Sequence, residues 1–360
     1  MKKTRIYLFI IFSSISFFQM DCKDDSPIPP DNKPLLGKRD YTWSIDTIAY
    51  PDNNQTLMYD ICGNSFSDVY VVGHSDGSSA ATMYHYDGAK WLTTKYHVNE
   101  NGPIKGPIDL QGVYTFSSSD IWAVGERSYE YPENSGQYVD SGLIVHYNGV
   151  SWHEHNINVF QTLLAIWGTD SNNVWIGGLN GELYNTKGNK FIKESFPSNI
   201  GIAQIAGLNS NTIYIFGFSQ STPRYYSIYN YDGITWSIVD STNTFPSNPH
   251  FGNSSLWVVT NNILYSSGYG GVFQKSDDGW VKVLSTGTEN ITTIRGNSSN
   301  NLFAVGRGQI YHFNGVDWFK YEQFSDQNIL WYRTWSDGNV VFIIGLTLSG
   351  IGKTVVLRGY

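Results

Sequence analysis

Cysteine, charge and long hydrophobic segments are all scarce in this 360-residue sequence. Its two cysteines, Cys22 and Cys62, allow at most one intrachain disulfide. The apolar run Ile6–Phe18 is shorter than the roughly 20 residues that a membrane-spanning helix needs. Charged residues make up 15%, and the net charge is −8. An acidic protein repels phosphate backbones, so nucleic acid is not an expected partner.

Motifs of catalysis and cofactor binding are also lacking. The sequence has no serine nucleophile elbow, phosphate-binding glycine loop or dinucleotide fingerprint. No cluster of His, Cys and Asp has the spacing of metal ligands, so we expect neither a metal nor a cofactor. Cys62 lies in an apolar stretch and is expected to be a small buried residue. The sequence therefore favours a non-catalytic protein.

The N-terminus has the pattern of a secreted, lipid-anchored protein. Basic residues among the first five precede the apolar run, as in a secretory signal peptide. Cys22 resembles the lipidated first residue of a mature bacterial lipoprotein, although Asp21 stands where a small residue is usual. The Lys-Asp-Asp at residues 23–25 resembles the surface-export signal of Bacteroidota-type lipoproteins.

These resemblances imply three segments: a signal peptide (1–21), a lipidated flexible tether (22–40) and a single folded domain (41–360). A lipid on Cys22 would hold the protein at the outer membrane without a spanning helix, with the domain exposed outside the cell. Cys62 would then have no disulfide partner.

Glycine and aromatic residues are abundant, and they belong to a repeat. Its fullest form is Gly-Asn-Ser-x-x-Asp/Asn-Val-Trp-Ala-Val-Gly, followed after a loop by His-Tyr-Asp/Asn-Gly-x-x-Trp. The repeat ends its first half at seven positions, spaced 39 to 53 residues apart. They are Gly73, Gly125, Gly178, Gly217, Thr260, Gly306 and Gly345. A period near 45 residues is the blade length of a β-propeller.

The repeat predicts an all-β, seven-bladed propeller with four-stranded antiparallel blades. Val-Trp-Ala-Val segments are typical of strands buried on both faces. The Asp-Gly and Asn-Gly pairs are typical of tight hairpin turns. The last unit lacks its outer strand, and residues 41–46 resemble the outer strand at residues 234–239. The N-terminal strand should therefore complete the last blade and close the ring. A six- or eight-bladed ring is the alternative.

The repeat resembles the BNR/Asp-box repeats of bacterial propellers, and its period resembles that of kelch and WD repeats. The similarity rests on Asp-Gly-x-x-Trp segments such as Asp87–Trp91, with residues 276–280 the nearest variant of an Asp-box. Sialidase-like enzymes of this kind need an arginine cluster. Arg295 and Arg333 lie on expected inner strands, and Arg127, Arg224 and Arg307 follow expected second strands. A carbohydrate-active propeller of sialidase, hydrolase or lyase type is thus an alternative function.

The histidines are interpreted as structural. His85, His146 and His312 occupy the same repeat position, whereas a catalytic residue is usually unique in a chain. Asp87 and Asn148, with Asp232 and Asn314 at the same position, are interpreted as turn residues.

Two long aromatic loops are the best candidates for ligand binding. Residues 126–141 are expected to form a long loop between the second and third strands of one blade, and residues 218–226 a shorter one. Tyrosines of this kind stack on sugars or anchor protein partners. The candidate ligand-binding residues are Glu126, Arg127, Tyr129, Tyr131, Glu133, Tyr138, Arg224 and Tyr225.

The function expected from the sequence is a non-catalytic cell-surface binding protein with a monomeric domain. Its ligand would be a glycan or an extracellular or envelope protein, presented to the loop-rich face of the propeller. Besides the enzyme, a scaffold subunit of an envelope complex is a further alternative.

Overall fold

A computed structural model of the chain describes residues 36–48, 55–75, 82–94, 104, 108–133, 135–188, 190–243, 249–260, 263–350 and 352–360. Cys22, the expected signal peptide and most of the expected tether lie outside the described residues. The segment Leu35–Tyr360 forms one compact unit. Within the described ranges, no helix has the length and hydropathy to cross a membrane.

Four antiparallel sheets of four strands follow one another along the chain. The first holds β2 (Thr56–Ser65), β3 (Asp68–Ser75), β4 (Met83–Tyr86) and β5 (Trp91–Thr93). The second holds β6 (Ile108–Ser117), β7 (Asp120–Glu130), β8 (Tyr138–Tyr147) and β9 (Trp152–His155). The third holds β10 (Leu163–Asp170), β11 (Asn173–Gly178), β12 (Leu183–Lys187) and β13 (Lys190–Lys193), with the short 3₁₀ turn η2 (Leu179–Gly181). The fourth holds β14 (Gly201–Asn209), β15 (Thr212–Phe218), β16 (Tyr225–Tyr231) and β17 (Trp236–Asn243).

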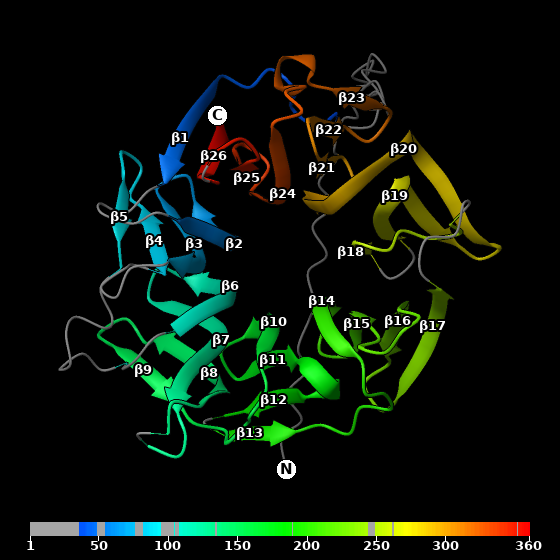
Figure 1. Cartoon of the computed structure of the whole chain (residues 1–360). Helices are drawn as coiled ribbons and strands as arrows, with labels where there is room; N and C mark the ends of the chain where they lie inside the picture. Colours follow the sequence, from blue (N-terminus) through cyan, green and yellow to red (C-terminus); the bar gives the residue numbers. More distant parts are fainter. Residues whose placement is uncertain are drawn as a thin grey trace, which may run out of the picture. The chain divides into compact units, whose positions relative to one another are not determined.

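Two further sheets complete the ring in Figure 1. One has six strands: β18 (Ser255–Thr260), β19 (Ile263–Ser276), β20 (Gly279–Ser298), β21 (Asn301–Gly306), β22 (Gln309–Phe313) and β23 (Trp318–Lys320). The other has the order β1-β26-β25-β24, with β1 (Trp43–Ile48), β24 (Ile329–Ser336), β25 (Val341–Thr347) and β26 (Thr354–Gly359). The short 3₁₀ turn η3 (Glu322–Phe324) lies between β23 and β24.

The prediction of seven blades is wrong, because the described strands form six sheets, five of four strands and one of six. The strand responsible is β20. Its first half pairs with β19 and its second half pairs with β21, so the expected fifth and sixth units share one continuous strand. The six-stranded blade places both β18 and the second half of β20 on the inner side of the ring, where they contact β14 and β24.

Thr260 is not the equivalent of the repeat glycine. Residues 252–260 were expected to be the second strand of their unit, but β18 is the edge strand of its sheet and lies beside β14. Gly268 holds the equivalent position, since it follows the strand segment that pairs with β18. A Cβ there would overlap the backbone nitrogen of Asn253.

The predicted ring closure is confirmed. β1 pairs antiparallel with β26 from Trp43↔Gly359 to Ile48↔Thr354, so the two ends of the described unit share a blade (Figure 1). Asp46 on β1 binds Arg358 through two hydrogen bonds, of 2.7 and 3.1 Å, and accepts a third from Trp91 Nε1 at 2.9 Å. β1 is thereby linked to its own blade and to the first one.

Six inner strands, β2, β6, β10, β14, β20 and β24, share a bulge that explains the repeat glycines. In each, the pairing skips the residue that follows the partner of the repeat glycine. A Cβ on Gly73 or Gly125 would overlap a carbonyl oxygen of the strand beside it, and only glycine lacks this atom. The skipped residues are Tyr59, Gln111, Leu164, Ala203, Thr292 and Tyr332, all partly exposed.

Apolar side chains fill the space between neighbouring blades. One cluster joins Met58, Val71 and Tyr84 of the first blade to Phe342 and Val356 of the last, all at most 4% exposed. Each buried side chain of this size contributes roughly 1.5–3 kcal/mol. The ring is therefore held by packing between blades, and the polar groups on its faces and inner edge are available for other roles.

Candidate functional site

The expected long loop at residues 126–141 is mostly strand. β7 and β8 continue past their blade as a two-stranded hairpin, paired from Glu126↔Gly142 to Glu130↔Tyr138. The alternation of polar and aromatic residues in this segment is typical of a ribbon with both faces in solvent. The expectation of a loop here is corrected to a projecting hairpin.

The base of the hairpin is held by two of the predicted site residues. Arg127 makes a bidentate ion pair with Glu154 of β9, with distances of 2.8 and 2.6 Å. Glu126 accepts a hydrogen bond from the hydroxyl of Thr162, and burial, with Asp140 and Asp109 nearby, raises the pKa of this carboxyl. These two residues position the hairpin.

The tip of the hairpin carries the exposed aromatic residues. Tyr131 and Tyr138 are 63% and 69% exposed, and Glu133 beside them is also exposed. Tyr129 lies edge-on to Tyr131, with ring centroids 6.4 Å apart. Exposed tyrosines on a paired backbone lose little entropy on binding, which makes them good contact residues.

The second predicted segment borders the same face. The guanidinium of Arg224 lies 5.1 Å from the Phe218 ring centroid, and Tyr225 is 39% exposed. Asn180 of η2 bridges Gln161 and Gln220, at 2.9 and 2.5 Å. Because Gln161 adjoins the Thr162 that binds Glu126, one line of polar contacts runs from the hairpin base to this segment.

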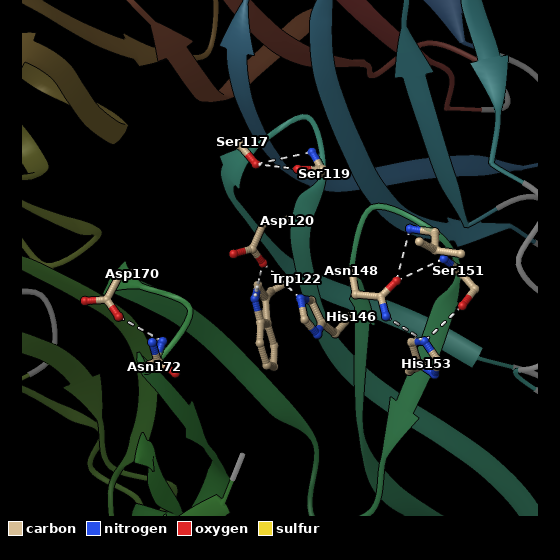
Figure 2. A network of polar contacts seen from close by, with 11 residues as sticks. Ser117, Ser119, Asp120, Trp122, His146, Asn148, Ser151, His153, Asp170 and Asn172 are labelled. Atoms are coloured by element: carbon tan, nitrogen blue, oxygen red, sulfur yellow. Dashed lines mark hydrogen bonds and ion pairs between the residues drawn. The ribbon is translucent and has the colours of Figure 1, made fainter. Parts of the chain in front are cut away.

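The repeated histidines are structural, as expected. His85 binds Asp68 and His146 binds Asp120, both at 2.9 Å, within separate blades. His312 binds Asn301 at 2.8 Å in the same way. Figure 2 shows the second blade, where Asp120 also accepts from Trp122 Nε1 and His146 stacks on that indole.

The turn role of the repeated Asp and Asn residues is also confirmed. In Figure 2, the Asn148 side chain accepts hydrogen bonds from the backbone of Val150 and Ser151, both at 3.0 Å. Asp87, Asp232 and Asn314 make the same pair of contacts. In the described ranges, no group of three or more His, Cys, Asp or Glu residues could hold a metal ion.

A second polar site lies on the inner strands. Asp60 on β2 is 3.6 Å from the Nε of Arg333 on β24, and it accepts a hydrogen bond of 3.1 Å from the backbone of Val113 on β6. Arg295 on β20 stacks over Trp257 of β18, at 4.9 Å from the ring centroid. We call Asp60, Arg295 and Arg333 the axial cluster.

The axial cluster is only partly compensated in charge. Burial raises the pKa of Asp60, and the two guanidiniums oppose this rise. Burial lowers the pKa of Arg295 to about 10, still well above neutral pH. The cluster therefore contains two guanidinium groups and one carboxyl group.

Part of this cluster could be found in the sequence. The inner-strand positions expected for Arg295 and Arg333 are confirmed. Asp60 was missed, although a signal exists: Asp60 and Arg333 occupy the position directly after the bulge. The other inner strands with this bulge carry uncharged residues there, namely Gly112, Ala165, Gln204 and Thr293.

The other three arginines of the expected cluster lie elsewhere. Arg127 and Arg224 are on the hairpin face, and Arg307 donates to the carbonyl of Gln327 at 2.7 Å. Cys62, on the same strand as Asp60, was expected to be buried but is partly exposed, and it lies 3.4 Å from the Thr115 hydroxyl. Burial raises the pKa of its thiol, so a reactive thiolate is disfavoured.

The six-stranded blade also carries a half-open pocket that the sequence did not indicate. It has a volume of about 480 Å³ and is lined by Tyr265, Leu284, Phe313 and Trp318, among others. Asp317 on its wall is ion-paired with Arg39 at 3.0 Å. Its walls come from β19, the first half of β20, β22 and the start of β23.

Comparison with solved structures shows the fold. The chain is similar to YCF48 bound to D1 peptide, with 15% identity over 90% of this chain and 99% of that one and a TM-score of 0.62. It is also similar to the extracellular domain of the two-component system BT4673 from B. thetaiotaomicron, with 14% identity, 87% and 40% coverage and a TM-score of 0.56. The Neurospora crassa Pan2 WD40 domain matches with 12% identity, 90% and 97% coverage and a TM-score of 0.58.

No protein-family profile and no curated protein matches the chain. The resemblance to BNR/Asp-box repeats and the lipoprotein assignment stay predictions. The β-propeller with repeats is shown by the structure, and its solved neighbours, at 12–15% identity, share that fold.

Proposed function

We propose that this chain is a non-catalytic binding module, displayed outside the cell on a lipid anchor, that captures a protein partner on its hairpin face. The observation that carries the proposal is the β7–β8 hairpin, which presents Tyr131 and Tyr138 to solvent on a hydrogen-bonded ribbon. The Arg127–Glu154 and Glu126–Thr162 contacts fix its base, so little conformational entropy is lost when a partner binds.

A protein is favoured over a glycan for two reasons. The exposed tyrosines alternate with acidic residues along an open ribbon, and such aromatic contacts are typical of protein interfaces. A solved neighbour of the same fold is described as bound to a peptide.

Site-specific photo-crosslinking in intact cells tests the proposal. A benzophenone amino acid would replace Tyr138 at the hairpin tip or, as a control, Val150 in a turn, which is 85% exposed. We expect one discrete protein adduct from position 138 and none from position 150. The same adducts from both positions, or none from either, would reject the hairpin as a binding surface. Binding to a glycan array, lost on replacing Tyr131 and Tyr138 by Ala, would reassign the ligand as a sugar.

The lipid anchor is tested separately. We expect the chain to incorporate an alkyne-tagged fatty acid and to partition with membranes, and Cys22→Ser to abolish both. Surface display predicts that protease added to intact cells degrades the domain. Labelling that persists in Cys22→Ser would contradict the anchor without affecting the hairpin proposal.

A further inference from the structure

The axial cluster is assembled by three inner strands that are distant in the sequence. β24 supplies Arg333, β2 supplies Asp60 and β20 supplies Arg295. The side chains of Arg333 and Asp60 are 35% and 20% exposed, so solvent reaches both. Because charged groups inside a ring are costly unless paired, their arrangement requires an explanation.

Pairing within the protein accounts for only part of the positive charge. Asp60 lies 3.6 Å from Arg333 and also accepts the Val113 amide. Among the described residues, Arg295 has no carboxylate within 4.0 Å, and its guanidinium instead packs on the Trp257 indole. One positive charge is therefore left without a counter-ion beside an aromatic ring, inside a protein whose net charge is −8.

The cluster has the composition of a site for a monoanion. A guanidinium presents parallel N–H donors that match the two oxygens of a carboxylate. Two arginines and one aspartate leave a net charge of +1, which one carboxylate neutralises and a dianionic phosphate would exceed. Asp60 beside it can accept an N–H from the same ligand, and Trp257 offers an apolar wall.

We infer that the axial cluster is a binding site for a carboxylate of an acidic peptide segment, held between Arg295 and Arg333. An acidic peptide fits best, because it combines a carboxylate for the arginines with a backbone N–H for Asp60. The site shares no residue with the hairpin face, so it does not rest on the function proposed above, and either can fail alone.

The conservative variant of Asp60 gives the sharpest test. Asp60→Asn keeps an oxygen whose two lone pairs can accept the Val113 amide and a ligand N–H, but it removes the internal counter-ion of Arg333. We expect Asp60→Asn to bind carboxylates roughly five- to tenfold more tightly, whereas a purely structural role for Asp60 predicts no gain. Arg295→Gln and Arg333→Gln should each weaken binding roughly tenfold or more.

The fluorescein-labelled probes are hexaglutamate and hexaglutamine, the latter with either a free or an amidated C-terminus. Hexaglutamate against hexaglutamine tests side-chain carboxylates, and the two forms of hexaglutamine test the terminal carboxylate. Binding to the purified chain would be followed by fluorescence anisotropy, with trigalacturonate as a competing acidic sugar. Arg307→Gln is the control, since it removes an exposed arginine outside the cluster. Circular dichroism would check that each variant is folded.

Two results together support the inference: a carboxylate-dependent signal, and opposite effects of Asp60→Asn and the arginine variants. Absence of binding to every carboxylate peptide would overturn it. Equal binding by Arg295→Gln, Arg333→Gln and Arg307→Gln would also overturn it. A folded Asp60→Asn variant that binds carboxylates no more tightly than the unmodified chain would do the same. Binding of trigalacturonate alone, with the same arginine dependence, would replace the peptide by an acidic sugar and so reject the proposal as stated.

Discussion

Replacing Asp46 by Asn should loosen the closure of the ring. Asp46 accepts three hydrogen bonds, two from Arg358 at 2.7 and 3.1 Å and one from Trp91 Nε1 at 2.9 Å. Asn retains one acceptor oxygen, but it removes the negative charge and turns the second oxygen into a donor facing the guanidinium. Arg358, whose side chain is 13% exposed, would keep the hydroxyl of Tyr86 and at most one contact with the amide oxygen.

The magnitude lies between two limits. Removing one partner of a fully buried ion pair costs about 3–5 kcal/mol, and an exposed pair is worth about 0.2–1 kcal/mol. The Asp46 side chain is 25% exposed, so we expect a loss of about 2–3 kcal/mol in the free energy of unfolding. With an unfolding entropy of about 2.1 cal/mol/K per residue, this loss lowers the melting temperature by roughly 3–5 °C.

Urea unfolding followed by tryptophan fluorescence measures this loss, and Asp87→Asn is its matched control. Asp87 is a turn residue whose equivalents are Asn148 and Asn314, so the same change there should cost less than about 0.5 kcal/mol. In a double-mutant cycle, Asp46→Asn and Arg358→Gln should be less than additive by about 1 kcal/mol or more. Equal effects of Asp46→Asn and Asp87→Asn, or additivity with Arg358→Gln, would refute the proposed role of the Asp46–Arg358 contact in closing the ring.

Three other predictions concern the repeat, pH and the hairpin. Gly125→Ala should cost about 3 kcal/mol or more, because the added methyl overlaps the carbonyl of Asp109. Gly352→Ala is the control, since its methyl meets the flexible Leu346 side chain at 3.1 Å and the Thr347 carbonyl at an ordinary contact distance of 3.4 Å; similar melting temperatures would contradict this. Burial lowers the pKa of His312 to about 4, so the folded state disfavours protonation of this side chain. The free energy of unfolding should therefore fall by roughly 3 kcal/mol as the pH drops from 6.5 to about 4. His312→Asn, which copies Asn185 of another blade, should remove that extra loss in unfolding experiments, and an unchanged pH profile would contradict it. Tyr131→Ala and Tyr138→Ala should change the free energy of unfolding by less than about 0.5 kcal/mol, since both side chains are exposed; a larger loss would make them structural.

The local features of this propeller follow from the residues of its repeats. The four-stranded antiparallel blades, the turns built on Asn148 and its equivalents, and the pairing of β1 with β26 all follow from short segments. The blades and turns depend on residues within a few positions of one another. The pairing of β1 depends on the outer strand that the last repeat lacks. The inner positions of Arg295 and Arg333 follow from the same alignment.

How segments distant in the sequence combine could be learned only from the tertiary structure. The repeat count did not reveal that β20 continues through two units. The length of a strand depends on its pairing partners, and β20 pairs first with β19 and then with β21. Likewise, β7 and β8 pair along a segment whose composition suggested a loop. Asp60 joins Arg295 and Arg333 because ring closure places β2 beside β24, which in turn lies beside β20. Electrostatic contacts act through space, so a cluster drawn from both ends of the chain exists only once the ring has closed.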